Sequence, residues 1–391
     1  MKCVVLSLSK HAAAGRAVAT GRLLTRWLRF ALVLLSGLCA CARARAQLVD
    51  GSVYVRTDSD QTTVIAPRAH ARAPAGEGTH LDFTYAADVW TSASIDIRAS
   101  ASKAITEQRD ELDVGIDHEF EDLTFSAGYR FSTEPDYLSN GGNVGLAYDF
   151  AGNNATLALG AGASFDQVGR AGDRNFSLPV RNLNGRIAFT QVLDQDTLLQ
   201  LIYEVMHAYG YNASPYRYIG IGGTDGLCWA ALTQFCTPEA APEQRLRHAA
   251  ALRVRRSLGS AVSVGAGYRF YRDSWSLASH TLLADLTVVP LDGWIAALRY
   301  RFYTQNSVAF YRASYPRLDP AQRFYTNDKE LSPLSVHRLA LDLERTFPIS
   351  ERGQLVRPTL SIAGSIYSFS NFIPLGTIRA LEVTLGVAFE L

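Results

Sequence analysis

Apolar and polar residues alternate along most of the chain between residues 47 and 391. In the last segment Leu381, Val383, Leu385, Val387 and Phe389 alternate with Glu382, Thr384, Gly386, Ala388 and Glu390. Successive side chains of a β-strand point to opposite faces, so one face of this segment is apolar and the other is polar or small. A period of two, recurring over many segments, predicts β-strands and not helices.

The alternation predicts sixteen strands, most of them with twelve or more residues. Strands of this length cross a bilayer when they are tilted, and an even number of them is typical of outer-membrane barrels. The alternative is a fourteen-strand barrel with an N-terminal extension, because polarity is mixed around Pro67 in the first two strands. The predicted ranges are 48–57, 61–72, 78–88, 104–119, 122–133, 139–150, 154–166, 180–193, 196–208, 244–257, 260–273, 276–289, 293–306, 334–347, 356–369 and 378–391.

The connections between these segments differ according to the strand that they follow. Even-numbered strands are followed by short turns such as Asp194-Gln195 and Leu258-Gly259, whereas the long connections 89–103, 167–179, 209–243 and 307–333 all follow odd-numbered strands. Outer-membrane barrels have short periplasmic turns and long external loops. The sequence therefore predicts an all-β, transmembrane, antiparallel up-and-down barrel with both termini on the periplasmic side.

Residues 1–46 have the composition of a secretory signal peptide. Arg22, Arg26 and Arg29 precede an apolar run from Phe30 to Ala40, and Ala44-Arg45-Ala46 follows it. A basic region, a short apolar region and an A-x-A site are the marks of a cleaved signal, and a run this short does not span a bilayer as a helix. We expect a mature chain of residues 47–391, with lipidation at Cys39 or Cys41 as the alternative.

Composition favours the membrane barrel over a soluble β-sandwich with the same period. A soluble sandwich would carry scattered surface lysines, but after residue 46 the chain has only Lys103 and Lys329. Residues 1–46 contain basic side chains and no Asp or Glu, so the rest of the chain is net acidic although the whole has a formal charge of +1. Nucleic acid is therefore an unexpected partner, because phosphate binding needs basic side chains.

Several ordered motifs extend over nearly the whole mature chain and resemble one family. The chain is similar to an uncharacterised Gram-negative outer-membrane family, domain-of-unknown-function family 3570. The resemblance implies an outer-membrane barrel and carries no established activity or functional residue. The motifs are Leu81-Asp82-Phe83-Thr84-Tyr85, Ser214-Pro215-Tyr216-Arg217, Tyr268-Arg269-Phe270-Tyr271, Tyr300-Arg301-Phe302-Tyr303 and Glu330-Leu331-Ser332-Pro333.

The polar phase of the strands separates acidic from basic residues. We expect an acidic wall on strands three to six and a basic wall on strands ten to thirteen, nearly opposite in a ring of sixteen, with a field across the lumen. The alternative is that these charges pair with neighbours and fill a polar interior. The acidic wall comprises Asp82, Asp88, Asp113, Asp117, Glu119 and Asp149, and the basic wall Arg245, Arg247, Arg253, Arg255, Arg269, Arg299 and Arg301.

Two long connections are rich in aromatic residues, and one of them holds Cys228 and Cys236. An exported chain meets an oxidising compartment, so we expect these cysteines to form a disulfide that closes a small loop, with two free thiols as the alternative. Connections 209–243 and 307–333 either fold into the mouth as a constriction that binds a solute or form an external cap without a ligand. Gly222-Gly223-Thr224-Asp225-Gly226 is a turn or, alternatively, a calcium loop.

Together these features predict a porin-like channel or transporter for small polar solutes, embedded in outer-membrane lipid. The first alternative is a closed barrel with a structural or partner-binding role, and the second is a barrel enzyme. We expect no enzymatic activity, because no G-x-S-x-G motif occurs and alternation sends Asp117 and His118 to opposite faces. No metal or other cofactor is expected. No pattern in the sequence predicts the transported solute, the oligomeric state or a periplasmic partner.

Overall fold

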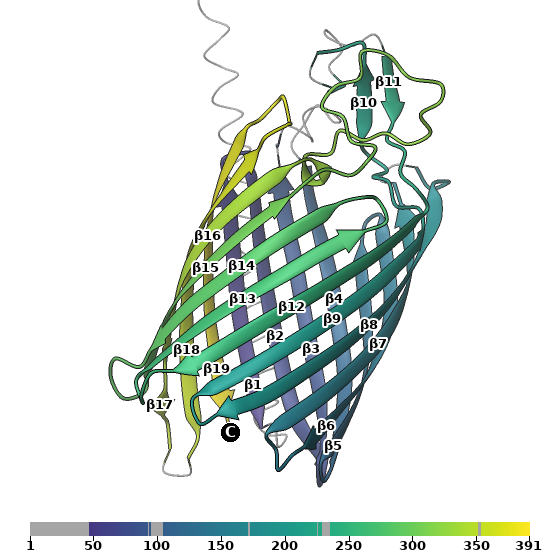
Figure 1. The fold of residues 1–391 in the computed structure, drawn as a ribbon. Coiled ribbons are helices and arrows are strands. Elements are labelled where there is room, and N and C mark those ends of the chain that lie inside the picture. The colour runs from purple at the N-terminus through teal and green to yellow at the C-terminus, as the bar shows by residue number, and fades with distance from the viewer. Residues whose placement is uncertain are drawn as a thin grey trace, which may run out of the picture.

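The wall of the molecule is a closed antiparallel barrel of sixteen strands (Figure 1). The computed structural model describes residues 47–92, 94, 105–170, 173–224, 226–228, 235–350 and 353–391, so the predicted signal peptide lies outside the described residues. Within the described part of the chain, no helix has the length and apolar character needed to cross a membrane.

All sixteen predicted strands are present, and their limits differ from the prediction by a few residues. The wall strands are β1 (Leu48–Asp58), β2 (Thr62–Gly76), β3 (Thr79–Ser92), β4 (Ile105–Phe120), β5 (Leu123–Glu134), β6 (Tyr137–Phe150), β7 (Ala155–Gly169), β8 (Ser177–Asp194), β9 (Thr197–Gly210), β12 (Gln244–Ser257), β13 (Val262–Asp273), β14 (Ala278–Val288), β15 (Trp294–Gln305), β16 (Leu334–Arg345), β18 (Leu355–Phe369) and β19 (Thr377–Glu390).

The first two strands belong to the barrel, which settles the choice between fourteen and sixteen strands. β1 pairs with β19 on one side and with β2 on the other, so it closes the ring. Closure removes the free edges that an open sheet would expose. A two-residue strand, β17 (Phe347–Pro348), continues the line of β16 after a break and pairs with β18.

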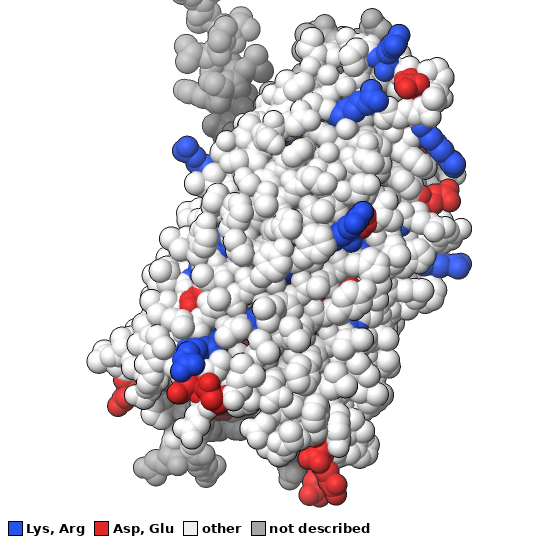
Figure 2. Space-filling model, viewed as in Figure 1, with Lys and Arg blue, Asp and Glu red and all other residues white. Residues whose placement is uncertain are grey.

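The apolar phase of the strands faces outwards. Large apolar side chains in the wall are among the most exposed of the molecule, for example Phe165, Leu183 and Leu385 at 62%, 57% and 59% exposure. On the face shown in Figure 2, the wall between the two rims carries few Lys, Arg, Asp or Glu side chains. An outward apolar band is what a bilayer requires of a β-barrel, so the polar phase lines the lumen.

Three tyrosine–histidine pairs occupy the outward face towards the end of the barrel that carries the long loops. The tyrosine hydroxyls lie 2.7–2.8 Å from the Nδ1 atoms of the histidines, in the pairs Tyr203–His248, Tyr268–His280 and Tyr300–His337. These histidines thus lie on the apolar, outward phase of their strands. Amphipathic aromatic residues of this kind are typical of the membrane–water interface.

Buried apolar residues gather at the long-loop end. One cluster contains Trp275, Leu277, Val308 and Tyr311, and a second contains Ile219, Ile221 and Tyr315. The connection between β9 and β12 forms a small hairpin of β10 (Tyr218–Ile221) and β11 (Phe235–Pro238), and the connection between β15 and β16 ends in the 3₁₀ helix η1 (Lys329–Leu331). We call these two connections, residues 211–243 and 306–333, the external cap.

Candidate channel lumen and external cap

Residues of the predicted acidic wall lie on the inward phase of β3, β4 and β6, but cations stand among them. Arg72 of β2 lies 2.9 Å from Asp82 and 2.8 Å from Asp117. Arg109 lies 2.5 Å from Asp88, and Arg130 lies 2.6 Å from Asp113. Asp149 accepts a hydrogen bond from the hydroxyl of Thr156. Most of the acidic wall is therefore neutralised by arginines on its own strands or on the adjoining β2.

Histidines add to this network near the end of the barrel where the turns are short. His70 lies between Asp50 and Asp82, at 2.7 and 3.1 Å. His80 lies 3.2 Å from Asp117. His118, next to Asp117 in sequence, contacts the hydroxyl of Thr79 instead, at 2.6 Å. Asp117 and His118 thus engage different partners on different faces, as alternation requires.

Two groups of side chains bring three potential metal ligands together in the described part of the chain. The ligand atoms of His80, Asp117 and Glu119 lie within 4.8 Å of one another, and so do those of Glu107, Glu134 and Asp136. Arg72 already neutralises Asp117, and the second group consists of carboxylates alone. Neither group has a second feature that indicates a metal.

The predicted basic wall lies on the inward phase of β12, β13 and β15, and four of its seven arginines have carboxylate partners close by. Arg245 lies 2.6 Å from the buried Asp273, and Arg255 lies 2.9 Å from Asp285. The other two pairs are Arg269–Glu204 at 3.1 Å and Arg299–Asp342 at 2.5 Å. Pairing with neighbours, the alternative to a field between opposite walls, thus describes much of this wall as well.

Three arginines of the basic wall have no carboxylate within 4.0 Å among the described residues: Arg247, Arg253 and Arg301. Arg247 donates to the sulfur of Met206 at 3.0 Å, and Arg301 lies over the ring of Tyr303. Unpaired charge is costly to remove from water, so these guanidinium groups require a hydrated lumen. They give the β12–β15 side an excess of positive charge.

The lumen wall contains glycines that leave room for neighbouring polar side chains. A Cβ atom on Gly265 would lie 2.2 Å from Oδ1 of Asp285, a distance that requires a shift. The carboxylate of Asp285 therefore lies across the backbone of β13, from which it reaches Arg255 on β12. The side chain of Asp285 thus occupies the space that the absence of a Cβ atom at Gly265 leaves open.

The two connections that form the external cap pair with each other and reach other parts of the rim. Isolated bridges join Ile221 to Tyr315 and Ala240 to Tyr325. Tyr216 donates a hydrogen bond to Asp136 in the turn between β5 and β6. Lys329 lies 3.6 Å from Asp60 in the turn between β1 and β2. The cap is thus anchored on both sides of its own strands.

A buried polar network connects the two halves of the cap. Glu239 accepts hydrogen bonds from the hydroxyl of Thr326 and the backbone N–H of Ser214. Arg217 lies 2.5 Å from Asp328 and 3.7 Å from Glu239. Burial raises the pKa of the Glu239 carboxyl above its ordinary value, and the nearby Arg217 opposes that rise.

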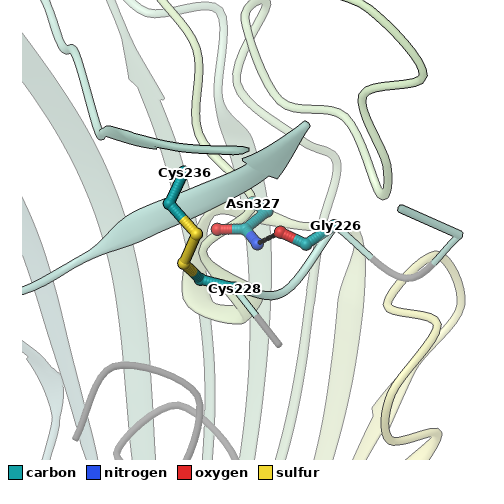
Figure 3. Close-up of a disulfide and its surroundings, with 4 residues drawn as sticks. All are labelled: Gly226, Cys228, Cys236 and Asn327. Carbon is teal, nitrogen blue, oxygen red and sulfur yellow. Dashed lines mark hydrogen bonds between the residues drawn. A yellow bond between two sulfur atoms is a disulfide. The ribbon is translucent and has the colours of Figure 1, made fainter. Parts of the chain in front are cut away.

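The predicted disulfide between Cys228 and Cys236 is present, with the two Cα atoms 5.8 Å apart (Figure 3). Close to it, Asn327 from the other connection donates a hydrogen bond of 2.5 Å to the carbonyl oxygen of Gly226. A disulfide restricts the unfolded loop and so stabilises its folded form. Trp229 and Asp225, which the sequence places in this loop, lie outside the described residues.

Two neighbouring cavities lie along the barrel wall, and the larger of them is also lined by the cap. The larger has a volume of about 540 Å³ and is lined by cap residues and by β12–β15, including Arg245, Arg269 and Tyr271. The smaller, of about 270 Å³, is lined by β8, β9, β12 and β13 and shares Arg269 and Tyr271 with the first. The cap therefore lies above a recess that continues along the basic wall.

Sequence reasoning missed the partners that neutralise the two walls. Arg72, Arg109, Arg130 and Glu204 all lie on the inward phase of predicted strands, so alternation could have identified each of them. Their pairing depends on strand register, which the sequence does not display. Arg72 was hardest to recognise, because the outward positions beside it in β2 are small alanines and Pro67 interrupts the strand, so the apolar phase is weak.

The closed ring, the outward apolar band and the polar lumen define an outer-membrane β-barrel. Residues 97–186 and 180–352 match the family described as "Protein of unknown function (DUF3570)". The chain belongs to this family. No curated protein matches the sequence.

Solved structures with a similar fold share little sequence with this chain. A bacterial polysaccharide outer membrane secretin has 7% identity and a TM-score of 0.50, covering 88% of this chain and 99% of that one. OprD of Pseudomonas aeruginosa has 9% identity and a TM-score of 0.43, with coverages of 88% and 96%. OccK2 of Pseudomonas aeruginosa, in complex with glucuronate, has 11% identity and a TM-score of 0.40, with coverages of 88% and 98%. At these identities the similarity concerns the fold alone.

Proposed function

We propose that the protein is a channel for small polar solutes across the outer membrane and that its lumen favours anions. The observation that carries the proposal is the excess of positive charge on β12–β15, where Arg247, Arg253 and Arg301 have no carboxylate within 4.0 Å among the described residues. Sixteen-stranded barrels are wide enough for a water-filled passage. Fixed charge in such a passage raises the local concentration of ions of opposite sign.

Conductance of the refolded protein in a planar bilayer tests the proposal. We expect discrete conductance steps in potassium chloride and a reversal potential that shows preference for chloride when the salt concentrations on the two sides differ. The preference should weaken as the salt concentration rises, because the screening length falls from about 10 Å at 0.1 M to about 3 Å at 1 M. Absence of conductance from protein that shows heat-modifiable migration on a denaturing gel would refute the channel.

A second candidate function is a closed barrel that has a structural or partner-binding role. The folded cap favours it, because the cap has its own buried clusters and is anchored to the turns at Asp60 and Asp136. Deletion of cap residues 307–328 distinguishes the two functions. A closed barrel should begin to conduct only after the deletion, whereas a channel should conduct before it. In either case we propose a protein without enzymatic activity.

A further inference from the structure

One cluster in the upper lumen contains more positive charge than its surroundings neutralise. Arg186 of β8, Arg247 of β12 and Arg269 of β13 line the smaller cavity together with a single carboxylate, Glu204 of β9. Glu204 lies 3.1 Å from Arg269 and 3.9 Å from Arg186. Three guanidinium groups thus share one carboxylate, and the cavity has a net charge of about +2 from these groups.

Two of the three arginines in this cluster have exposed side chains, and Arg247 is half-buried. Arg186 is 54% exposed and Arg269 is 38% exposed, although both contact Glu204. Arg247 donates to the sulfur of Met206, a weak acceptor, and also makes a side-chain hydrogen bond with Tyr271. A guanidinium group has five N–H donors, and the described hydrogen bonds use only some of them in each of the three arginines.

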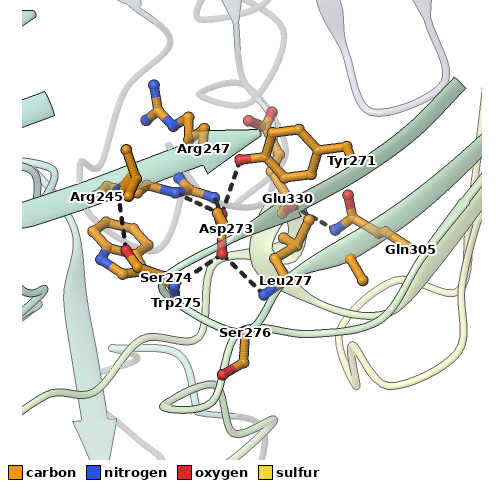
Figure 4. Close-up of polar contacts among 12 residues, drawn as sticks. Arg245, Arg247, Tyr271, Asp273, Ser274, Trp275, Ser276, Leu277, Gln305 and Glu330 are labelled. Atoms are coloured by element: carbon orange, nitrogen blue, oxygen red, sulfur yellow. Dashed lines mark hydrogen bonds and ion pairs between the residues drawn. The ribbon is translucent and has the colours of Figure 1, made fainter. Parts of the chain in front are cut away.

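The neighbouring Arg245 shows what a neutralised arginine looks like in the same region. Asp273 accepts hydrogen bonds from Arg245 at 2.6 and 2.8 Å and from the hydroxyl of Tyr271. Figure 4 shows this network, with the guanidinium group of Arg247 directed away from Asp273. Arg245 is also held over the ring of Trp275. Arg245 is thus neutralised by a buried carboxylate, whereas Arg247 has only neutral partners and keeps its positive charge for a solute.

From this arrangement we propose that Arg186, Arg247 and Arg269 form a binding site for a small oxyanion with two negative charges, either an organic phosphate or a dicarboxylate. The planar guanidinium group matches carboxylate and phosphate oxygens with two parallel hydrogen bonds. Two negative charges would balance the excess of the cluster, and Tyr271 and Met206 supply apolar surface for the rest of the solute. A cavity of about 270 Å³ accepts only a small molecule. This site deepens the proposed channel function, since solutes reach it through the lumen.

Isothermal titration calorimetry of the folded, detergent-solubilised full chain tests the site. Inorganic phosphate and succinate serve as dianion probes and acetate as the monoanion, all at the same ionic strength. We expect saturable binding of a dianion with an affinity at least about tenfold higher than that of acetate, since one additional charge-assisted contact has this magnitude. Binding of phosphate alone, of succinate alone, or of both shows whether the site accepts phosphates, dicarboxylates or both classes of solute.

Two variants locate the binding. Arg247→Gln and Arg186→Gln should each weaken dianion binding by about tenfold, because each removes one charged donor from the cluster. Arg357→Gln is the matched control, because it removes a lumen arginine that pairs with Glu390 at the other side of the barrel, and it should leave the affinity unchanged. Heat-modifiable migration checks that every variant is folded.

The site is refuted if no dianion binds saturably, or if Arg247→Gln and Arg186→Gln both bind like the unmodified protein. These results are distinct from failure of the channel. A protein that conducts without saturable dianion binding keeps the proposed function and loses the site. Saturable binding in a protein without conductance keeps the site and refutes the channel.

Discussion

The two sides of the lumen have opposite formal charge but differ more in how that charge is neutralised. On β3 and β4 the acidic residues pair with arginines on the same or adjoining strands, above all Arg72 of β2, which bridges Asp82 and Asp117. On β12–β15 the arginines outnumber nearby carboxylates, and Arg247, Arg253 and Arg301 have none within 4.0 Å among the described residues. The electric field near a wall therefore depends more on how many of its charges lack a partner than on the sign of its formal charge.

The largest change should follow from removal of the bridge on the acidic side. Arg72→Met leaves Asp82 and Asp117 facing each other, with side chains only 28% and 14% exposed. Leaving partly buried carboxylates without their cation costs about 2–4 kcal/mol. We expect the free energy of unfolding in urea to fall by about this amount and the channel to become less anion-selective.

Arg68→Met is the matched control for this prediction. Arg68 lies on the same strand and the same inward phase, is exposed, and has no carboxylate partner within 4.0 Å in the described ranges. Its replacement should change the free energy of unfolding by less than about 0.5 kcal/mol. Equal losses in the two variants would show that the bridge is not what stabilises this side.

A smaller change should follow from removal of unpaired charge on the basic side. Arg253→Gln combined with Arg301→Gln removes two positive charges and leaves every described carboxylate with its partner. We expect the preference for chloride over potassium to fall by about twofold or more, which corresponds to some tenths of a kcal/mol. Reversal potentials in a salt gradient measure it. The control pairs Arg255→Gln with Asp285→Asn, which removes one charge of each sign and should leave the preference nearly unchanged. If the control shifts the preference as much, unpaired charge is not the determinant.

The wall and the cap also differ in how well the sequence predicts them. Alternation identified each wall strand because the bilayer and the lumen demand opposite chemistry at successive positions, as in Leu381 to Phe389. Inward charges followed from the same pattern, but their partners depend on register, so the Arg72 bridge and the cluster at Glu204 were not apparent. The cap sequence has no regular alternation of apolar and polar residues. Its contacts, such as Arg217 with Asp328, join residues far apart in sequence, and only the Cys228–Cys236 pair had a local signal.

The smallest effect on chloride preference is expected from a variant that tests how the basic side holds a neutralised pair in place. In Gly265→Ala the new Cβ would lie 2.2 Å from Oδ1 of Asp285, so the carboxylate must leave the backbone of β13 and its contact of 2.9 Å with Arg255. Overpacking of this kind costs about 1 kcal/mol. Urea unfolding should show that loss in the unmodified background and no loss when Asp285→Ala has already removed the colliding carboxylate. Gly364→Ala, a wall glycine with no atom within 4 Å of the added Cβ, is the control.

Because Gly265→Ala moves a charge and removes none, the chloride preference should stay constant while stability falls. A clear change in preference would mean that the position of a paired carboxylate matters to passing ions as much as the unpaired arginines do.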